Sequence, residues 1–217
     1  MFSFFIMILL KLIVGALGTN CYIFGSDTTK EVVIIDPGAE GNTIIKAVED
    51  LGTKPIAVLL THCHFDHTMK VGQIIRYFKI PLMYNRKELD SGGFTNFKKA
   101  DKWLSEGDSI KIGEIELHIL ETPGHSLGGI SFYSKDVKEF NGKKIDGIIF
   151  TGDLIFRRSI GRSDIGGGNQ NQLFSSIKNK IMYNPELSDN FIIFPGHMGN
   201  TSIGEERKLN LFKKSFL

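Results

Sequence analysis

Three histidines and an aspartate lie close together in the sequence, directly after an apolar run. They fall within six residues and are potential metal ligands: His62, His64, Asp66 and His67. In an extended chain alternate side chains point the same way, so the first two histidines share a direction and Cys63 points away from them. Imidazole and carboxylate groups suit Zn²⁺ and iron. Because burying this many polar groups without a partner is costly, the cluster predicts a metal site in which no cysteine needs to take part.

Three more potential ligands lie in loops that follow apolar runs: His125, Asp153 and His197. A glycine precedes each of them, which lets the backbone bend tightly and approach its neighbours closely. Strand ends are where a rigid scaffold presents functional groups. Together with the cluster, these residues supply enough ligands for two metal ions. His118, by contrast, lies on the polar side of the alternating run 115–120, and we expect it to face solvent.

Short apolar runs alternate with stretches of helical periodicity along the chain. The expected strands are 7–14, 20–25, 32–35, 57–60, 81–84, 109–112, 115–120, 130–133, 148–150 and 191–194. The expected helices are 43–51, 71–78, 170–181 and 202–212. The last of these opens with Ser202 and Glu205 in a capping-box arrangement, and short helices and loops are expected over 85–107. The alternation predicts an α/β fold with sheets covered by helices, built as one domain over residues 1–217.

The composition is that of an ordinary globular protein. Of the 217 residues, 41% are hydrophobic, and 26 basic against 24 acidic residues leave a formal net charge of +2. Nucleic-acid binding needs clustered basic surface, so we expect no nucleic-acid partner. The two cysteines, Cys21 and Cys63, are too few for a disulfide framework and are interpreted as buried apolar groups. We expect a cytoplasmic protein that is a monomer or a small homo-oligomer.

The first 17 residues are nearly all apolar. A signal peptide would carry a positive charge ahead of the apolar run, whereas Lys11 lies inside it. A membrane-spanning helix needs about 20 apolar residues, more than this interrupted run provides. We therefore predict a buried first strand over 7–14 and no membrane association. Residues 2–6 are either an extension of the chain or the product of a start codon placed ahead of the true one at Met7.

The segments THCHFDH, TPGHS, FTGD and PGH resemble the ordered motifs of the metallo-β-lactamase superfamily. Longer segments resemble one of its branches, the glyoxalase II-like hydrolases related to hydroxyacylglutathione hydrolase. These segments are TNCYIF, DPGAE, TPGHSLGGISF, FTGDLIFRRSIGRSD and PGHMGNTSIGEER. The similarity extends from about residue 14 to about residue 210.

This resemblance implies a four-layer αββα sandwich with the site along one sheet edge. It also implies two metal positions, the first held by His62, His64 and His125 and the second by Asp66, His67 and His197. Asp153 would bridge the two positions. The implied cofactors are two divalent cations, Zn²⁺ in the first place, with iron or manganese as alternatives. Asp36 and Thr61 are implied to hold the metal-binding imidazoles from behind.

The branch resemblance implies a thioesterase that cleaves S-2-hydroxyacylglutathione or a related small-molecule thioester. Two metals about 3.5–4 Å apart can share a hydroxide, with Asp66 and Asp153 as the catalytic residues. Arg162 is the candidate for binding a substrate carboxylate, because arginine can hold such a group bidentately; a solvated or structural role is the alternative. Two-domain glyoxalase II enzymes use a C-terminal helical domain to help hold glutathione, and only a short tail follows His197 here. Other thioesters, small esters and lactones therefore stay open.

Three other functions would use some of the same residues. Persulfide dioxygenases share the fold and use a single iron, whose facial-triad ligands here would be His62, His125 and Asp153. The segment GRSD at 161–164 resembles that group, whereas PGHMG and SIGEER resemble the hydrolases more. A nuclease of the superfamily is opposed by the near-neutral charge. A metal-binding protein without catalysis is opposed by the complete ligand set, since a dinuclear site with open positions is reactive.

Overall fold

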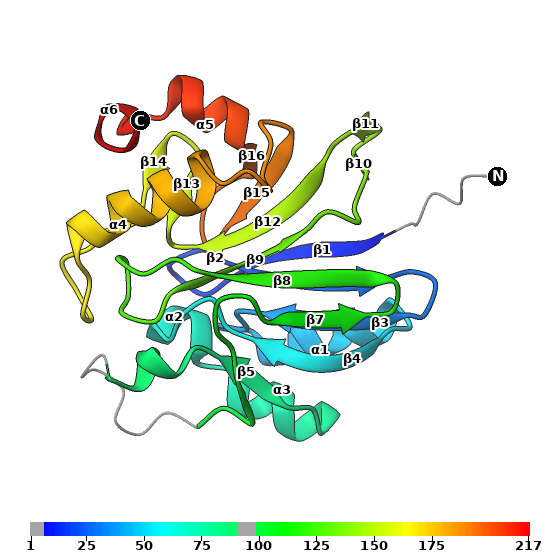
Figure 1. Cartoon of the computed structure of the whole chain (residues 1–217). Coiled ribbons are helices and arrows are strands. Elements are labelled where there is room, and N and C mark those ends of the chain that lie inside the picture. The colour runs from blue at the N-terminus through cyan, green and yellow to red at the C-terminus, as the bar shows by residue number, and fades with distance from the viewer. Residues whose placement is uncertain (1–6, 91–98) are drawn as a thin grey trace.

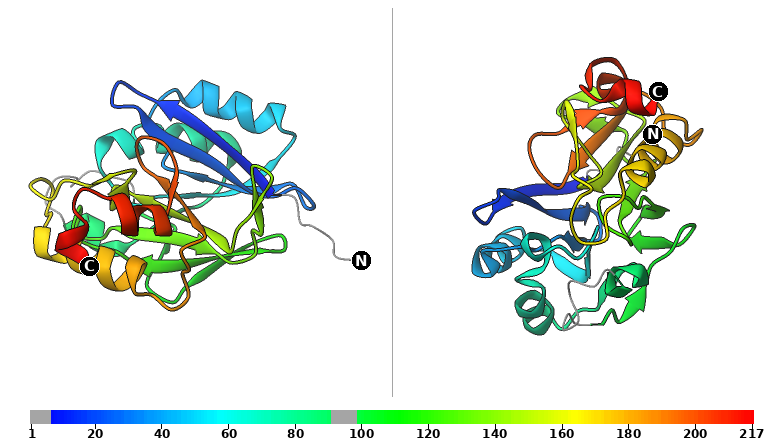
Figure 2. Two further views of the ribbon diagram at one scale, coloured as in Figure 1. Left: turned by 90° about the horizontal axis from the view of Figure 1, so that it is seen from above. Right: turned by 90° about the vertical axis from the view of Figure 1, so that its left-hand side faces the viewer.

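Two six-stranded sheets lie face to face, and helices cover the outer side of each (Figures 1 and 2). The structure, a computed structural model, describes residues 7–90 and 99–217. Residues 2–6 and the loop glycines at 92 and 93 lie outside the described residues. The four-layer αββα arrangement confirms the fold expected from the sequence motifs.

The first sheet comes from the N-terminal half of the chain, in the order β1-β2-β3-β4-β5-β6. Its strands are β1 (Met7–Val14), β2 (Thr19–Ser26), β3 (Glu31–Ile35), β4 (Lys54–Leu59), β5 (Leu82–Tyr84) and β6 (Lys102–Trp103). The first two pairings are antiparallel and the remaining three are parallel. The helices α1 (Gly41–Asp50) and α3 (Val71–Phe78) pack their apolar sides on the outer face of this sheet.

The second sheet comes from the C-terminal half, in the order β16-β15-β12-β9-β8-β7. Its strands are β7 (Ser109–Ile112), β8 (Ile115–Glu121), β9 (Ile130–Ser134), β12 (Gly147–Gly152), β15 (Phe191–Pro195) and β16 (Thr201–Ser202). Only β12 and β15 pair in parallel among the described strands of this sheet. Its outer face is covered by α4 (Gln170–Ser176), the π-helix η2 (Ile177–Met182), α5 (Ile203–Leu209) and α6 (Lys213–Phe216).

The main core lies between the two sheets and is rich in aromatic and branched side chains. The ring of Phe150, from the second sheet, lies 5.1 Å from that of Tyr22 and 5.2 Å from that of Phe24, both from the first sheet. Alternation along β8 buries Leu117 and turns His118 to the other side. His118 is half-buried there, with its ring 5.1 Å from that of Tyr133, so the expectation that it faces solvent holds only in part.

The sequence patterns did not predict several short strands. Beside β6 and β16, these are the hairpins β10 (Glu139–Phe140) with β11 (Lys143–Lys144) and β13 (Ile155–Phe156) with β14 (Ser159–Ile160). Strands of two residues are too short to display an alternating pattern. The short helices α2 (Phe65–Thr68) and η1 (Arg86–Asp90, a 3₁₀ helix) complete the chain.

Two predicted helix boundaries were wrong. The helix expected over 170–181 is α-helical only to Ser176 and continues with π geometry. The helix expected over 202–212 begins correctly, with the Ser202 hydroxyl accepting a hydrogen bond from the Glu205 backbone N–H, but α5 ends at Leu209. Asn210 is extended there because its amide donates to the carbonyl of Ser159 and to Glu206, which holds the backbone out of the helix.

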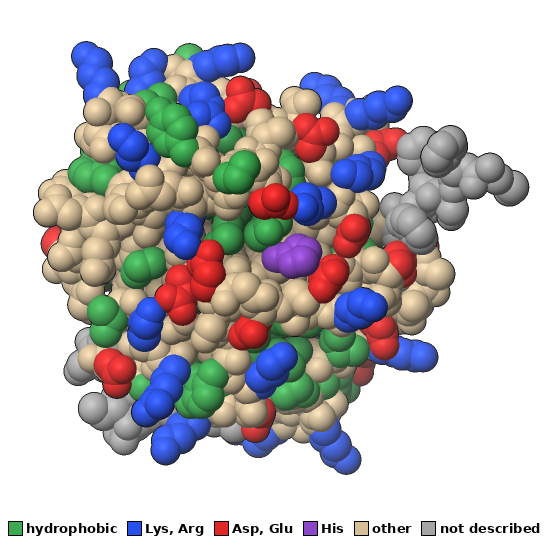
Figure 3. Space-filling model, viewed as in Figure 1, with side chains coloured by type: hydrophobic (Ala, Val, Ile, Leu, Met, Phe, Trp, Pro, Cys, Tyr) green, Lys and Arg blue, Asp and Glu red, His purple; other side chains and the backbone are tan. Residues whose placement is uncertain are grey.

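The first strand was predicted correctly in position but not in burial. β1 is an edge strand that pairs with β2 alone, so only Ile8 and Val14 are buried and the other residues are half-buried or exposed. Both cysteines are buried and free, as expected. None of the helices in the described ranges combines the length and apolar character needed to cross a membrane. Basic and acidic side chains are interspersed over the face in Figure 3, in line with the balanced charge.

Candidate metal centre

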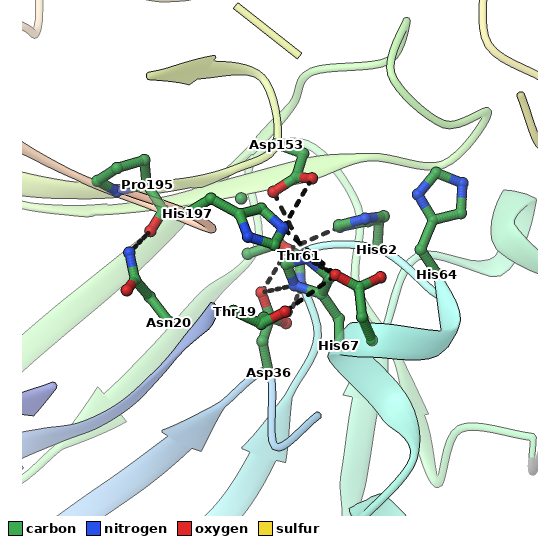
Figure 4. A network of polar contacts seen from close by, with 12 residues as sticks. Thr19, Asn20, Asp36, Thr61, His62, His64, His67, Asp153, Pro195 and His197 are labelled. Carbon is green, nitrogen blue, oxygen red and sulfur yellow. Dashed lines mark hydrogen bonds and ion pairs between the residues drawn. The ribbon is translucent and has the colours of Figure 1, made fainter. Parts of the chain in front are cut away.

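The candidate ligands lie where strands of both sheets end at a common edge. The cluster 62–67 follows β4, and His125 follows β8. Asp153 comes directly after β12, and His197 comes two residues after the end of β15. Figure 4 shows His197 and Asp153 entering from the second sheet opposite His62 and His67 from the first. The structure therefore brings together all seven residues that the sequence singled out.

The first group of candidate ligands consists of His62, His64 and His125, which are 2%, 9% and 6% exposed. The Nε2 atom of His125 lies 3.2 Å from Nε2 of His62 and 2.8 Å from Nδ1 of His64. The other ring nitrogen of His125 donates to the carbonyl oxygen of Arg162 at 2.7 Å. A carbonyl can only accept, so the proton of the neutral ring is on Nδ1 and Nε2 carries a lone pair.

His62 has the same tautomer for a related reason. The Thr61 hydroxyl donates to Asp36 Oδ2 at 2.6 Å, so its oxygen accepts from Nδ1 of His62 at 3.0 Å. The Nε2 atoms of His62 and His125 therefore direct lone pairs into the same space, and neither can donate to the other. A cation between them would satisfy both, so this group fits a metal ion.

The second group of candidate ligands consists of Asp66, His67 and His197. His67 donates from Nδ1 to Asp36 at 3.0 Å, which leaves a lone pair on its Nε2. That Nε2 atom is buried without a hydrogen-bond partner among the described residues, 3.5 Å from Asp66 Oδ2. His197 Nδ1 lies 3.2 Å from the carbonyl of Leu17, and its Nε2 lies 3.3 Å from Asp66 Oδ2. The lone pair of the neutral His67 ring and the Asp66 carboxylate lie side by side without a proton between them, so they also fit a cation.

Asp153 lies between the two groups. Its Oδ1 atom is 3.5 Å from Nε2 of His67, and its Oδ2 atom is 3.4 Å from Nε2 of His197 and 3.6 Å from Nε2 of His125. Oδ1 is buried and has no hydrogen-bond partner within the described part of the chain. One carboxylate thus contacts ligands of both groups, as a bridging residue would.

The electrostatics of the first group favour neutral imidazoles. Burial, followed by the neighbouring histidines, lowers the pKa of His62 and brings that of His64 to about 4. Burial also lowers the pKa of His125, although Asp153 opposes the shift. Neutral imidazole is the form that binds a metal, so these three rings are in the required state at pH 7.

In the second group, burial lowers the pKa of His67, but the ionised carboxylates of Asp153 and Asp66 raise it. Burial raises the pKa of Asp66 and of Asp153, but the adjacent histidines outweigh it, and both pKa values fall below the ordinary range. Burial lowers the pKa of His197, yet its contacts with Asp153 and Asp66 raise that pKa to about 10. A metal ion in this group would take the place of that proton.

Asp36 and Thr61 support the ligands as the resemblance implied. Asp36 is 1% exposed and accepts from the backbone N–H of Thr61 at 2.8 Å, in addition to its bonds with the Thr61 hydroxyl and His67. Asp36, His62 and His67 also form a possible ligand group. Both oxygens of Asp36 already accept hydrogen bonds, so this residue is suited to orient the imidazoles and not to bind a metal itself.

Some contacts of the site were not found by sequence reasoning. The hydroxyl of Thr19 donates to Asp66 Oδ2 at 2.9 Å, and Thr19 pairs with His197 in an isolated bridge. The segment TNCYIF carried a family resemblance but no chemical signal for this contact. The Arg162 side chain is 60% exposed and binds Asp164 bidentately, so its carbonyl, rather than its guanidinium, contacts a ligand.

The glycine before His197 is required by a close approach. A Cβ atom on Gly196 would lie 2.1 Å from Asp153 Oδ1 and 2.8 Å from Cε1 of His67. No side chain fits in that space without moving a ligand. The short sequence Pro-Gly-His is therefore fixed by packing against the site as well as by its turn.

Comparison with known proteins agrees with this geometry. Residues 14–197 match the model of the metallo-beta-lactamase superfamily. The hydroxyacylglutathione hydrolase GloC of Haemophilus influenzae is 32% identical, over 93% of this chain and 96% of that protein. The chain belongs to the metallo-beta-lactamase superfamily, and it combines the fold of a metallo-hydrolase with groups of histidine and aspartate suited to divalent metals.

Three solved structures are similar over nearly the whole chain. BLEG-1, a B3 metallo-beta-lactamase, is similar with a TM-score of 0.82 and 33% identity, over 95% of this chain and 99% of that one. ETHE1 from Myxococcus xanthus has a TM-score of 0.80 and 26% identity, over 96% and 88%. TTHA1623 in a di-iron-bound form has a TM-score of 0.79 and 28% identity, over 94% and 99%. Proteins named as a hydroxyacylglutathione hydrolase and as a B3 metallo-beta-lactamase are thus both similar to this chain.

Proposed function

We propose that the protein is a thioesterase of the glyoxalase II type, which hydrolyses S-2-hydroxyacylglutathione or a related thioester. The observation that carries the proposal is the pair of three-residue ligand groups joined by Asp153, whose distances to nitrogens of both groups are 3.4–3.6 Å. The proposed first metal position is His62, His64 and His125, and the proposed second is Asp66, His67 and His197. The hydrolase GloC, similar over nearly the whole chain, supports this substrate class.

Two divalent ions, when bound, lower the pKa of a water molecule to about 7 and polarise a substrate carbonyl. In the hydrolysis, the oxygen of water bonds to the thioester carbonyl carbon and the C–S bond breaks, giving a carboxylate and a thiol. A thiolate has a pKa near that of cysteine, about 8.5, so it leaves with little help from a general acid. We propose zinc as the metal. Iron and manganese suit the same ligands, and TTHA1623 has a di-iron-bound form.

Asp66 and Asp153 are the proposed catalytic residues. Both are carboxylates at neutral pH, because their pKa values lie below the ordinary range. The Thr19 hydroxyl donates to Asp66 and fixes its carboxylate, which can therefore accept a hydrogen bond from a water molecule and orient it. Arg162 lies next to the site with an exposed guanidinium, and we propose that it exchanges Asp164 for a substrate carboxylate.

The experiment is a substrate panel run with metal analysis on the same preparation. The panel contains S-D-lactoylglutathione, other thioesters, a lactone and a β-lactam. We expect two metal ions per chain and the highest kcat/KM on a thioester. Asp66→Ala should abolish turnover, whereas Asp27→Ala, which removes an exposed carboxylate paired with Lys30, should leave it unchanged. Full thioesterase activity in Asp66→Ala would contradict the proposed role.

A second candidate is a persulfide dioxygenase with one iron. His62, His125 and Asp153 form a compact set, with His125 Nε2 3.2 Å from His62 and 3.6 Å from Asp153, and ETHE1 is similar in structure. The intact second group, which such an enzyme does not need, favours the hydrolase. One iron per chain together with sulfite formation from glutathione persulfide would replace the hydrolase proposal with this one.

A further inference from the structure

Two buried polar side chains outside the ligand set bind the backbones that carry the ligands. They are Asn20, on β2, and Glu88, in η1, and they are 1% and 2% exposed. Each binds the loops of a different ligand group. We infer that Asn20 positions the second metal group and Glu88 positions the first, so that the two metal positions are supported separately. This inference rests on the proposed dinuclear centre.

Asn20 holds both sides of His197. Its Nδ2 atom donates to the carbonyl of Pro195 at 2.8 Å (Figure 4) and to that of Met198 at 3.0 Å, and its backbone N–H donates to the carbonyl of Gly196 at 2.7 Å. Three carbonyls around one ligand are thus bound by a single residue of the other sheet. Loss of this amide would release the loop that presents His197.

The loop around His197 needs such support. Met198 has a φ of 68°, in the left-handed region that side chains other than glycine adopt at a cost, and it is 56% exposed. Packing of its side chain therefore does little to hold this conformation. The Asn20 amide also leaves its own Oδ1 buried without a hydrogen-bond partner among the described residues. Its donor side is the part that the structure uses.

Glu88 links the two loops of the first group. Its Oε2 atom accepts from the backbone N–H of Cys63, between two ligands, at 2.6 Å. Its Oε1 atom accepts from the backbone N–H of Gly128, three residues after His125, at 2.7 Å. The two loops lie far apart in the sequence, and both oxygens of the carboxylate are needed to join them. A glutamine has one oxygen, so its NH₂ group would face one of these N–H groups.

The contacts of the two residues do not overlap. Asn20 binds the carbonyls of Pro195 and Met198 on either side of His197, whereas Glu88 binds the backbone N–H groups of Cys63 and Gly128 in the loops of the first group. Each residue acts through the orientation of ligands and contacts none of the ligand atoms. They are positioning residues, and substituting residues that orient metal ligands weakens metal binding by about 10- to 100-fold.

The test is titration of the metal-free protein with Zn²⁺, followed by calorimetry with a competing chelator. We expect two ions per chain in the wild type. Asn20→Leu is of similar size but has no donor. It should lower the affinity for one Zn²⁺ ion by about 10- to 100-fold and leave the affinity for the other unchanged. Asn20→Ser keeps one donor and admits water, so it should lose less Zn²⁺ affinity. It replaces the leucine variant in the test if that variant does not fold. The matched control is Tyr22→Phe, which removes the other hydrogen bond to Pro195 but leaves Met198 held.

Glu88→Gln should lower the affinity for the other Zn²⁺ ion by a similar factor. Its matched control is Glu121→Gln, the same change at a carboxylate that binds Lys87 and Asn85. Double variants identify which ion is affected. Asn20→Leu should add nothing to the loss in His197→Ala, and Glu88→Gln should add nothing to the loss in His62→Ala.

The outcomes separate the inference from the function on which it rests. A wild type that binds fewer than two Zn²⁺ ions contradicts the proposed centre and this inference together. A wild type that binds two, with variants that either bind both ions normally or lose both equally, overturns the inference and leaves the centre intact. Losses that add in the double variants would overturn it too, because they would mean that Asn20 and Glu88 do not act through these ligands.

Discussion

Asp36→Asn is expected to weaken binding at both proposed metal positions, because it changes the tautomers of two imidazoles. In the native site, Asp36 Oδ2 accepts from the Thr61 hydroxyl and from His67 Nδ1, which leaves His67 Nε2 free to bind a metal. With Oδ1 of the asparagine kept on the Thr61 backbone N–H, its NH₂ group takes the place of Oδ2. The amide would donate to His67, and the proton of that ring would move to Nε2.

The change also passes to the first group. Once the asparagine donates to the Thr61 hydroxyl, that hydroxyl turns its proton towards Nδ1 of His62, 3.0 Å away. The proton of His62 then lies on Nε2, where the lone pair for the metal should be. Changes to partners of this kind cost about 10- to 100-fold in metal affinity. One candidate ligand is affected in each proposed position. We therefore expect the combined affinity for the two ions to fall by about 10²- to 10⁴-fold, or about 3–5 kcal/mol of binding free energy.

The assay is the same Zn²⁺ titration, combined with NMR of the imidazole nitrogens in the metal-free protein to identify the tautomers. Asp27→Asn, an exposed carboxylate paired with Lys30, is the matched control and should behave as the wild type. If Asp36→Asn bound both ions within about threefold of the wild type, the hydrogen-bond argument for the tautomers would be refuted.

Three further outcomes are expected. Gly196→Ala would place a Cβ atom 2.1 Å from Asp153 Oδ1, and the resulting shift of about 1 Å should lower kcat/KM about a hundredfold. Gly199→Ala, where the nearest atom is 4.0 Å away, should not lower it. Equal activities of the two variants would contradict the packing argument. Arg162→Ala should raise KM for a carboxylated thioester about fivefold, as expected for an exposed charge contact, with metal content and kcat unchanged; an unaltered KM would exclude the substrate contact. Burial and nearby histidines bring the pKa of His64 to about 4 from its ordinary 6.5, so the folded metal-free protein binds fewer protons than the unfolded chain in this range. Its free energy of unfolding should therefore fall as pH drops from about 6.5 towards 4, and urea unfolding in chelator should show a smaller fall in His64→Gln.

Local sequence patterns were sufficient to predict most strands and the ligand types. Runs such as 115–120 and 148–150 display their alternation or apolar character within a few residues, because burial on a sheet imposes it directly. The candidate ligands after those runs, His125 and Asp153, were recognisable because each follows a glycine at a strand end. Strands of two residues, such as β13, carry no such pattern, since their pairing depends on neighbours in space.

The sequence by itself determined the residue types at the centre: imidazoles and carboxylates without a cysteine, in loops after apolar strands. Only the tertiary structure decided how they share their protons. The tautomers of His62 and His67 follow from Asp36, which lies 25 or more residues away in the chain. Hydrogen bonds of this range depend on how the two sheets pack, and no local pattern encodes them. The support of His197 by Asn20, across 175 residues, exists for the same reason: two distant strand ends meet at one edge of the fold.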